Sequence, residues 1–257
     1  MNLEQYLANK ARAKAEQPKY RQRCLTCRQP DFACYCLLVE RFDPKITFAI
    51  LIHPVEFQRR IATGRLSHLF LQGSHLILGA DYSRNDEVNA LIADDNNYCV
   101  NLFPGPRAKN FSSLNIEEKK SLFPANKRLV IFVIDGTWNT AKKTLWISEN
   151  LKQLPRVCLT PNRPSHFRVR KQPAAGCFST VEAIHQTIDS LGLSRGFDTS
   201  TRKHDLLLRA FDWLVEQQIS MTEKIRQQTG GLVHRHVRKR STKQNSKQSD
   251  IVSATLP

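Results

Sequence analysis

Short apolar runs alternate with amphipathic stretches along most of this chain. The apolar runs are rich in β-branched residues and end at glycine, proline or polar residues, which predicts buried strands. They cover residues 46–52, 75–78, 98–103, 129–134 and 157–160. Helical spacing of apolar residues is seen over residues 56–71, 86–93, 137–146, 179–191 and 205–228. Strands that alternate with helices predict an α/β domain with a mostly parallel sheet flanked by helices.

The two ends of the chain depart from this pattern. Residues 1–22 are polar and basic and lack an apolar signal-peptide core, so we interpret them as a helical segment of an intracellular, cytoplasmic protein. Residues 230–257 are polar, basic and poor in aromatic residues, which predicts a disordered tail. No apolar run reaches the length of a membrane span, so we expect no membrane partner.

Four of the seven cysteines lie close together, as Cys24-x-x-Cys27 and Cys34-x-Cys36. Thiolates at this spacing can close a tetrahedral zinc site. The alternative is a set of reduced thiols, or a redox pair, on a loop. Because protein sulfur fills all four positions, we predict a structural zinc ion in a knuckle over residues 23–40.

The formal net charge is +16 and the isoelectric point is near 9.8. Such an excess favours an anionic partner, most commonly nucleic acid, although a solubility charge would look the same. We expect basic side chains in the middle of the chain to contact RNA phosphates, with a solvated face as the alternative. These candidates are Arg59, Arg60, Arg65, Arg168, Arg170 and Lys171.

Polar residues gather where the predicted strands end, which is where α/β sheets bind ligands. The chain lacks both common phosphate-binding glycine loops, the Gly-x-Ser-x-Gly elbow and the His-Glu-x-x-His zinc motif, which disfavours most phosphoryl-transfer, dinucleotide and hydrolase functions. Four blocks remain: His53 to Gly64, Phe103-Pro104-Gly105, Asp135-Gly136-Thr137-Trp138, and Phe178-Ser179-Thr180-Val181-Glu182-Ala183.

These blocks, in this order behind a four-cysteine knuckle, resemble the DTW-domain family of tRNA-uridine aminocarboxypropyltransferases. The resemblance covers about residues 23–213, and the family is itself similar to the ribosomal RNA aminocarboxypropyltransferases. The Asp-x-Thr-Trp motif is matched by Asp135, Thr137 and Trp138. The His-Pro-x-Glu…Thr-Gly block is matched by residues 53–64, with Ala62 where asparagine is often found. The Leu-Ser-Thr-Leu-Glu-Ala block is matched by residues 178–183, with phenylalanine and valine in place of the leucines.

The resemblance implies a fold like the knotted SPOUT methyltransferases, with a knot in the C-terminal half and residues 41–229 as the catalytic domain that binds S-adenosylmethionine. It implies transfer of the 3-amino-3-carboxypropyl group from S-adenosylmethionine to N3 of a tRNA uridine, with release of methylthioadenosine. tRNA is then the expected partner, and nothing indicates an obligate protein partner. The alternatives are an RNA methyltransferase that uses the same donor, and a non-catalytic zinc-knuckle RNA-binding protein.

The family likeness also suggests roles for single residues. Asp135 is the candidate base for uridine N3, or else the cap of the helix that begins near Thr137. Trp138 can stack on adenine or uridine, or pack that helix onto the sheet. Glu182 can bind the donor or complete a cap with Ser179, while His53 is expected to be structural. The other candidate donor contacts are Phe103, Pro104, Gly105, Gly136, Thr137, Ser179 and Thr180.

Overall fold

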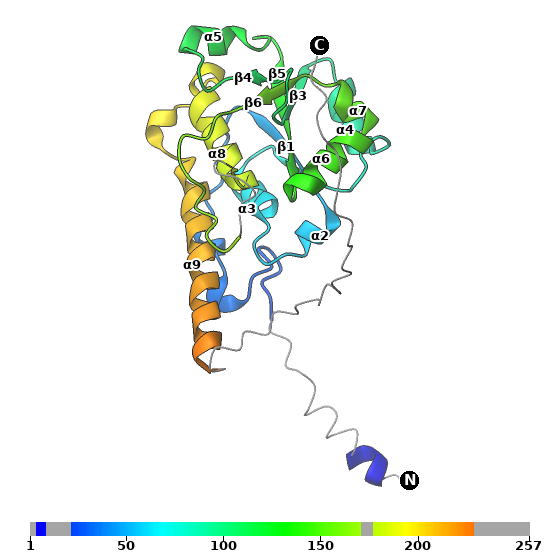
Figure 1. Ribbon diagram of the computed structural model, residues 1–257, viewed down its shortest axis with the longest axis vertical. Helices are drawn as coiled ribbons and strands as arrows, with labels where there is room; N and C mark the ends of the chain where they lie inside the picture. Colours follow the sequence, from blue (N-terminus) through cyan, green and yellow to red (C-terminus); the bar gives the residue numbers. More distant parts are fainter. Residues whose placement is uncertain (1–3, 9–21, 171–176, 229–257) are drawn as a thin grey trace, which may run out of the picture. The chain divides into compact units, whose positions relative to one another are not determined.

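A six-stranded sheet forms the centre of the described part of the computed structural model, which comprises residues 4–8, 22–170 and 177–228 (Figure 1). The strand order is β2-β1-β5-β3-β6-β4, and every pairing of neighbours is parallel. The strands are β1 (Thr47–Ile52), β2 (His75–Leu78), β3 (Asn97–Leu102), β4 (Lys109–Asn110), β5 (Arg128–Asp135) and β6 (Arg156–Cys158). The predicted mostly parallel α/β sheet is therefore confirmed.

Helices connect the strands and cover the sheet (Figure 1). They are α2 (Pro54–Phe57), α3 (Thr63–Phe70), α4 (Asp86–Ala93), α5 (Ile116–Ser121), α6 (Trp138–Ile147), α7 (Glu149–Gln153), α8 (Thr180–Leu191) and α9 (Asp205–Gln228). The short 3-10 helices are η1 (Asp31–Ala33), η2 (Cys36–Leu38), η3 (Leu193–Arg195) and η4 (Thr199–Thr201). Residues 4–8 are also helical.

Both faces of the sheet are buried, which explains why its central strands are continuous apolar runs. Along β5, Ile131 and Val133 pack into one core, and Val130 and Phe132 pack into the other. The larger core takes apolar residues from α3, α8 and the first part of α9. The smaller core takes residues from α4, α6 and α7. The sheet is thus the middle layer between two sets of helices.

The predicted helix over residues 56–71 is wrong, because the chain forms two helices there, α2 and α3. In a continuous helix the Gly64 amide would donate to the Arg60 carbonyl. Instead, Gly64 N–H donates to Asp135 at 3.1 Å, and the Arg60 carbonyl accepts from the Gln29 side chain. Asp135 and Gln29 therefore bind the backbone amide and carbonyl that would have bonded to each other in a continuous helix.

The prediction also lacked β4, α5 and α7, which are short. The start of α5 does carry a local signal, since the Asn115 side chain accepts from the amides of Glu117 and Glu118, and Glu118 accepts from the Asn115 amide. The strand predicted over residues 157–160 is Arg156–Cys158.

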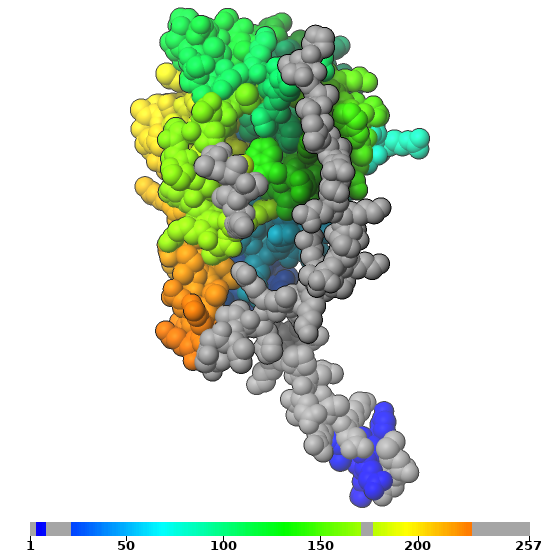
Figure 2. Space-filling model, in the orientation of Figure 1, coloured from blue at the N-terminus to red at the C-terminus, as the bar shows by residue number. Residues whose placement is uncertain are grey.

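The segment before α8, whose yellow-green surface is visible in Figure 2, packs against the part of α9 within residues 205–219. His166 Nδ1 lies 3.2 Å from Asp212 Oδ1, and Arg168 forms an ion pair with Glu216. By its contacts the chain divides into residues 1–219 and 220–257, so α9 belongs to both units. The tail predicted over residues 230–257, most of the segment predicted over residues 1–22, and Lys171 lie outside the described residues.

None of the helices within the described residues combines the length and the apolar character that crossing a membrane requires. The knot that the resemblance implies stays a prediction.

Candidate active site

A cavity of about 610 Å³ opens at the carboxyl ends of β3, β5 and β6. Its floor and walls come from the last residues of β5, the turn after β3 and the start of α8. This is the edge at which parallel sheets present their ligands, because the loops that follow the strands diverge there. The volume is in the range of small-molecule and cofactor sites.

Asp135, the last residue of β5, lies in this cavity wall with a buried carboxylate. Oδ1 accepts hydrogen bonds from Thr180 Oγ1 at 2.6 Å and from Thr63 Oγ1 at 3.1 Å. Oδ2 accepts from the Gly64 amide at 3.1 Å. The carboxylate thus joins the starts of α3 and α8 to the end of β5, and one lone pair of Oδ2 has no donor among the described residues.

Burial raises the pKa of Asp135, while the three hydrogen bonds and the Arg170 charge oppose that rise. A carboxylate in this position is a stronger base than an exposed aspartate.

Because Gly64 has no side chain, the Asp135 carboxylate can lie directly against it. A Cβ atom there would lie 2.7 Å from Asp135 Oδ2 and 2.8 Å from Ile50 Cγ2. Helix α3 therefore needs glycine at this position for close approach to the carboxylate.

The sequence left open whether Asp135 caps the following helix, and the structure excludes that role. The cap of α6 is Thr137, whose Oγ1 accepts from the Thr140 amide at 3.1 Å. His53 caps α2 in the same way, since its Nδ1 accepts from the Val55 amide at 3.2 Å. The structural role expected for His53 is confirmed.

Most of the predicted donor-binding residues line the cavity: Phe103, Pro104, Gly136, Thr137, Trp138, Ser179 and Thr180. Trp138 is 39% exposed, and its ring centroid lies 5.9 Å from that of Phe103. It therefore lies at the cavity wall and not in the core. The Phe103 amide donates to the Val157 carbonyl at 2.9 Å, so this amide is not a free donor for a ligand.

Gly105 and Glu182 do not line the cavity. The Glu182 carboxylate is fully buried and accepts from Ser165 Oγ, the His166 amide, the Ser179 amide and Ser179 Oγ at 2.6–2.9 Å. The prediction of direct donor contact by Glu182 is therefore corrected. Its carboxylate holds the start of α8 to the segment at residues 165–166, in keeping with the capping alternative.

The structure separates the basic candidates for RNA contact into buried and exposed side chains. Arg65 is buried, donates to the Phe57 carbonyl at 2.6 Å, and lies with its guanidinium 5.7 Å from the Phe57 ring centroid. The prediction that Arg65 contacts RNA is wrong, because its guanidinium is buried and donates to a backbone carbonyl. Arg59 pairs with Glu56 at 3.1 Å and Arg168 pairs with Glu216, whereas Arg60 is exposed.

Arg170 was predicted to bind RNA, yet the structure places it in the cavity wall. Its guanidinium centre lies 5.8 Å from the Phe167 ring centroid. Sequence reasoning also missed that Thr63 and Gly64 would bind Asp135. Their Thr-Gly pair was visible in the first block, but the partner lies 71 or 72 residues away.

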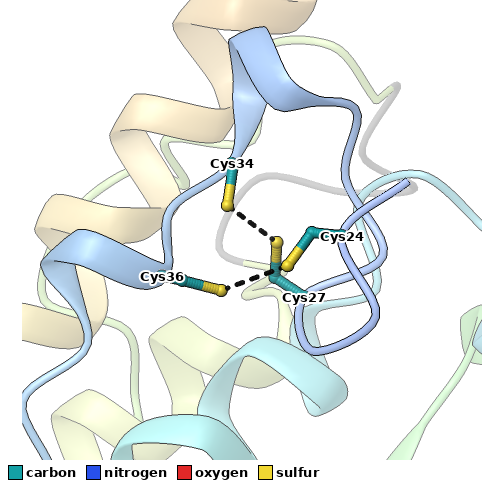
Figure 3. Close-up of side chains that lie close together, drawn as sticks. All are labelled: Cys24, Cys27, Cys34 and Cys36. Carbon is teal, nitrogen blue, oxygen red and sulfur yellow. Dashed lines mark hydrogen bonds between the residues drawn. The ribbon is translucent and has the colours of Figure 1, made fainter. Parts of the chain in front are cut away.

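The four cysteines point toward one another, as Figure 3 shows. Their sulfur atoms all lie within 4.8 Å of one another, with Cys24–Cys36 at 3.5 Å and Cys27–Cys34 at 3.6 Å. Tetrahedral zinc with bonds of about 2.3 Å needs sulfurs about 3.8 Å apart, so the cluster fits that ion. The amides of Cys27 and Thr26 lower the pKa of Cys24 to about 6, whereas burial raises the pKa of Cys27 and of Cys36. The sulfur geometry, and not the pKa values, therefore supports a metal.

A second group of possible ligands is formed by His185, His204 and Asp205, again within 4.8 Å. The carboxylates beside these histidines already have protein partners and need no metal ion. Arg202 donates to Asp189 at 2.6 Å and to Asp205 at 2.7 Å, while His185 and His204 contact Asp205 and Asp189 at 2.8 and 3.0 Å. We interpret this group as a structural network that ties α8 to the start of α9.

Comparison with known proteins gives one family and several curated relatives. The DTW domain model matches residues 21–219. The tRNA-uridine aminocarboxypropyltransferase 2 of Drosophila melanogaster is 26% identical over 182 residues, which cover 68% of each chain. The protein of that name from Mus musculus is 28% identical over 173 residues, 65% of this chain and 55% of the relative. The tRNA-uridine aminocarboxypropyltransferase A of Arabidopsis thaliana is 25% identical over 194 residues, 66% of this chain and 73% of the relative. No solved structure gives a significant match.

Proposed function

The chain belongs to the DTW-domain family, and from that membership we propose that it is a tRNA-uridine aminocarboxypropyltransferase. The names of its relatives support this activity. The observation that carries the proposal is the position of Asp135, a buried carboxylate with a free lone pair in the wall of a cofactor-sized cavity.

The proposed donor is S-adenosylmethionine and the proposed acceptor is N3 of a uridine. N3 gives up its proton, and its lone pair forms a bond to the γ-carbon of the aminocarboxypropyl group. The bond between that carbon and the sulfonium breaks, and its electron pair stays on sulfur, so methylthioadenosine leaves as a neutral thioether. All three carbons on sulfur are activated, so the enzyme must present the γ-carbon and not the methyl group.

Asp135 is proposed to accept the N3 proton. Burial raises its pKa, which brings its basicity closer to that of a useful general base near neutral pH. Thr63, Thr180 and the Gly64 amide hold the carboxylate in place, leaving Oδ2 as the atom that can receive a proton. Trp138 and Phe103 offer aromatic faces on which adenine or uracil can stack.

The knuckle is proposed to hold a structural zinc ion through Cys24, Cys27, Cys34 and Cys36. The net charge of +16 supports tRNA as the partner, with exposed Arg60 among the described candidates for phosphate contact. Action in the cytoplasm stays a prediction.

The test is a product assay on the full-length, zinc-loaded protein with S-adenosylmethionine and unmodified tRNA transcripts. We expect methylthioadenosine and a tRNA nucleoside heavier by one aminocarboxypropyl group, both detected by mass spectrometry. A transcript whose uridines are replaced by N3-methyluridine should give neither product. S-adenosylhomocysteine as the only product would indicate a methyltransferase, and the absence of donor binding would leave a non-catalytic RNA-binding protein.

A further inference from the structure

The cavity wall contains one anionic and one cationic side chain among its described residues, Asp135 and Arg170. The other lining residues are apolar or neutral. A charged side chain in such a wall faces a low-polarity space, where an opposite charge on a ligand is attracted more strongly than at the surface. The Asp135 carboxylate already has three protein donors.

Arg170 differs in this respect from the other arginines of the proposed RNA set. Its guanidinium forms no ion pair and no hydrogen bond with the described residues, and it lies 5.8 Å from the Phe167 ring centroid. Its charge does act on the carboxylates of Asp135 and Glu56, where it favours the ionised form. Arg168, two residues earlier, is neutralised by Glu216, and Arg65 donates to backbone carbonyls. Arg170 therefore brings to the cavity a guanidinium whose N–H donors have no hydrogen-bond partner among the described residues.

We propose that Arg170 binds the carboxylate of the donor's amino acid portion and so helps to determine which group is transferred. This inference rests on the proposed function. A guanidinium matches a carboxylate with two parallel hydrogen bonds. Ser179 and Thr180, at the start of α8, line the same cavity, but they already donate to Glu182 and Asp135, so Arg170 is the charged group left to bind a carboxylate.

The position of that carboxylate on the donor gives Arg170 a selective role. In aminocarboxypropyl transfer the carboxylate travels with the γ-carbon, whereas in methyl transfer it stays with the leaving group. A contact to the carboxylate therefore holds the fragment that must move and leaves the methyl group without such an anchor. A tRNA phosphate could use the same guanidinium, but the cavity-lining position favours the small carboxylate.

The experiment measures binding to the full-length, zinc-loaded protein by calorimetry without tRNA. Three probes are used: S-adenosylmethionine, its decarboxylated analogue, and methylthioadenosine. In Arg170→Ala we expect the affinity for S-adenosylmethionine to fall by about 10- to 100-fold, the usual loss of a hydrogen-bonded charge contact. The affinity for neutral methylthioadenosine should stay as in the wild type, and the affinity for the doubly cationic decarboxylated analogue should stay the same or rise, because a like charge is removed. Arg170→Lys should lie between, since it keeps the charge but loses the planar fork.

The matched control is Arg168→Ala, which removes an arginine from the same segment but not from the cavity, and should leave the affinity for S-adenosylmethionine unchanged. Equal weakening of all three probes in Arg170→Ala would overturn the proposal, because Arg170 would then only shape the cavity. An unchanged affinity for S-adenosylmethionine with weaker tRNA binding would also overturn it and assign Arg170 to phosphate. The product assay described above is independent: wild-type protein that prefers the carboxylate-bearing probe but yields no methylthioadenosine would refute the function and keep the subsite.

Discussion

The zinc knuckle and the Asp135 cluster are both small groups of polar atoms, but they are held together in opposite ways. The knuckle takes its four sulfurs from Cys24 to Cys36, and its surface exposes Leu25 and Leu37 almost completely. The Asp135 cluster joins residues that lie 45 to 72 positions apart, and every one of them is buried. The first is proposed to be stabilised by a metal, and the second is stabilised by the docking of two helices onto a sheet.

The difference shows where each region is vulnerable. We expect the knuckle to depend on a bound ion, because few of its apolar side chains, such as Ala33 and Tyr35, are buried. The Asp135 cluster depends on fit, because each partner must reach the carboxylate from a different element. The two regions also touch, since the Gln29 side chain donates to the Arg60 carbonyl just before α3.

The largest expected effect comes from removing a zinc ligand. Cys27→Ser should abolish stoichiometric zinc binding and lower the free energy of unfolding by several kcal/mol, because structural zinc contributes on the order of 10 kcal/mol to such folds. Zinc content by mass spectrometry and chemical denaturation measure the two effects. Cys99→Ser is the control, since that buried thiol donates to the Leu91 carbonyl, far from the knuckle. Full zinc content in Cys27→Ser would refute the site.

The next effect separates chemistry from stability at Asp135. In Asp135→Asn the new amide can accept from Gly64 and donate to Thr63 and Thr180, whose hydroxyls can also accept. We therefore expect a folded protein with turnover lower by about 10²- to 10⁴-fold, the contribution of a general base. Rates of methylthioadenosine release and thermal melting check this. Near-normal turnover would remove Asp135 from the chemistry.

A smaller effect tests how closely the cluster fits. Gly64→Ala should destabilise the protein by about 1–3 kcal/mol, the usual result of overpacking, although alanine favours a helix. The added methyl group would meet Asp135 Oδ2 at 2.7 Å. Gly105→Ala is the matched control, because its Cβ would meet only the flexible Arg156 side chain at 3.4 Å. Equal stability of the two variants in denaturant titrations would contradict the close packing.

The smallest effect concerns pH and His185, in the middle of α8. Burial lowers the pKa of His185 below its usual value of 6.5. Below pH 6.5 the unfolded state therefore binds a proton that the folded state does not bind. Stability should therefore fall on acidification, by at most about 1.4 kcal/mol per pH unit for this group. The groups around it are His204, Asp205 and Arg163. His185→Gln should flatten the pH dependence of denaturation, and an unchanged slope would assign the effect elsewhere.

Periodicity was sufficient for elements whose partners are apolar. The bounds of α4 and α9 match the predictions, because a continuous amphipathic pattern determines each of them. The helix over residues 56–71 failed because Gln29 and Asp135, both distant in sequence, take its backbone groups. No local pattern contains that information.

The site was predicted in the same uneven way. The cysteine spacing predicted the knuckle because all four ligands lie in one short segment. Asp135 was found because it ends a strand, but its partners Thr63 and Thr180 depend on how α3 and α8 dock. Arg65 was wrongly predicted to contact RNA, because the sequence alone does not show whether an arginine is buried or exposed. The cavity-lining position of Arg170 could not be predicted, because residues 161–170 have no periodicity that shows where a side chain points.

The buried Glu182 carboxylate has a consequence for the thermodynamics of ligand capture. Its four hydrogen bonds fasten the start of α8 to the segment that leads to Arg170 before any ligand arrives. Two walls of the cavity are thus ordered in advance, and binding does not have to immobilise them. Each contact with a ligand then costs less conformational entropy than it would if these two walls became ordered only on binding. We therefore expect Glu182 to contribute to affinity through preorganisation, without contact to the ligand.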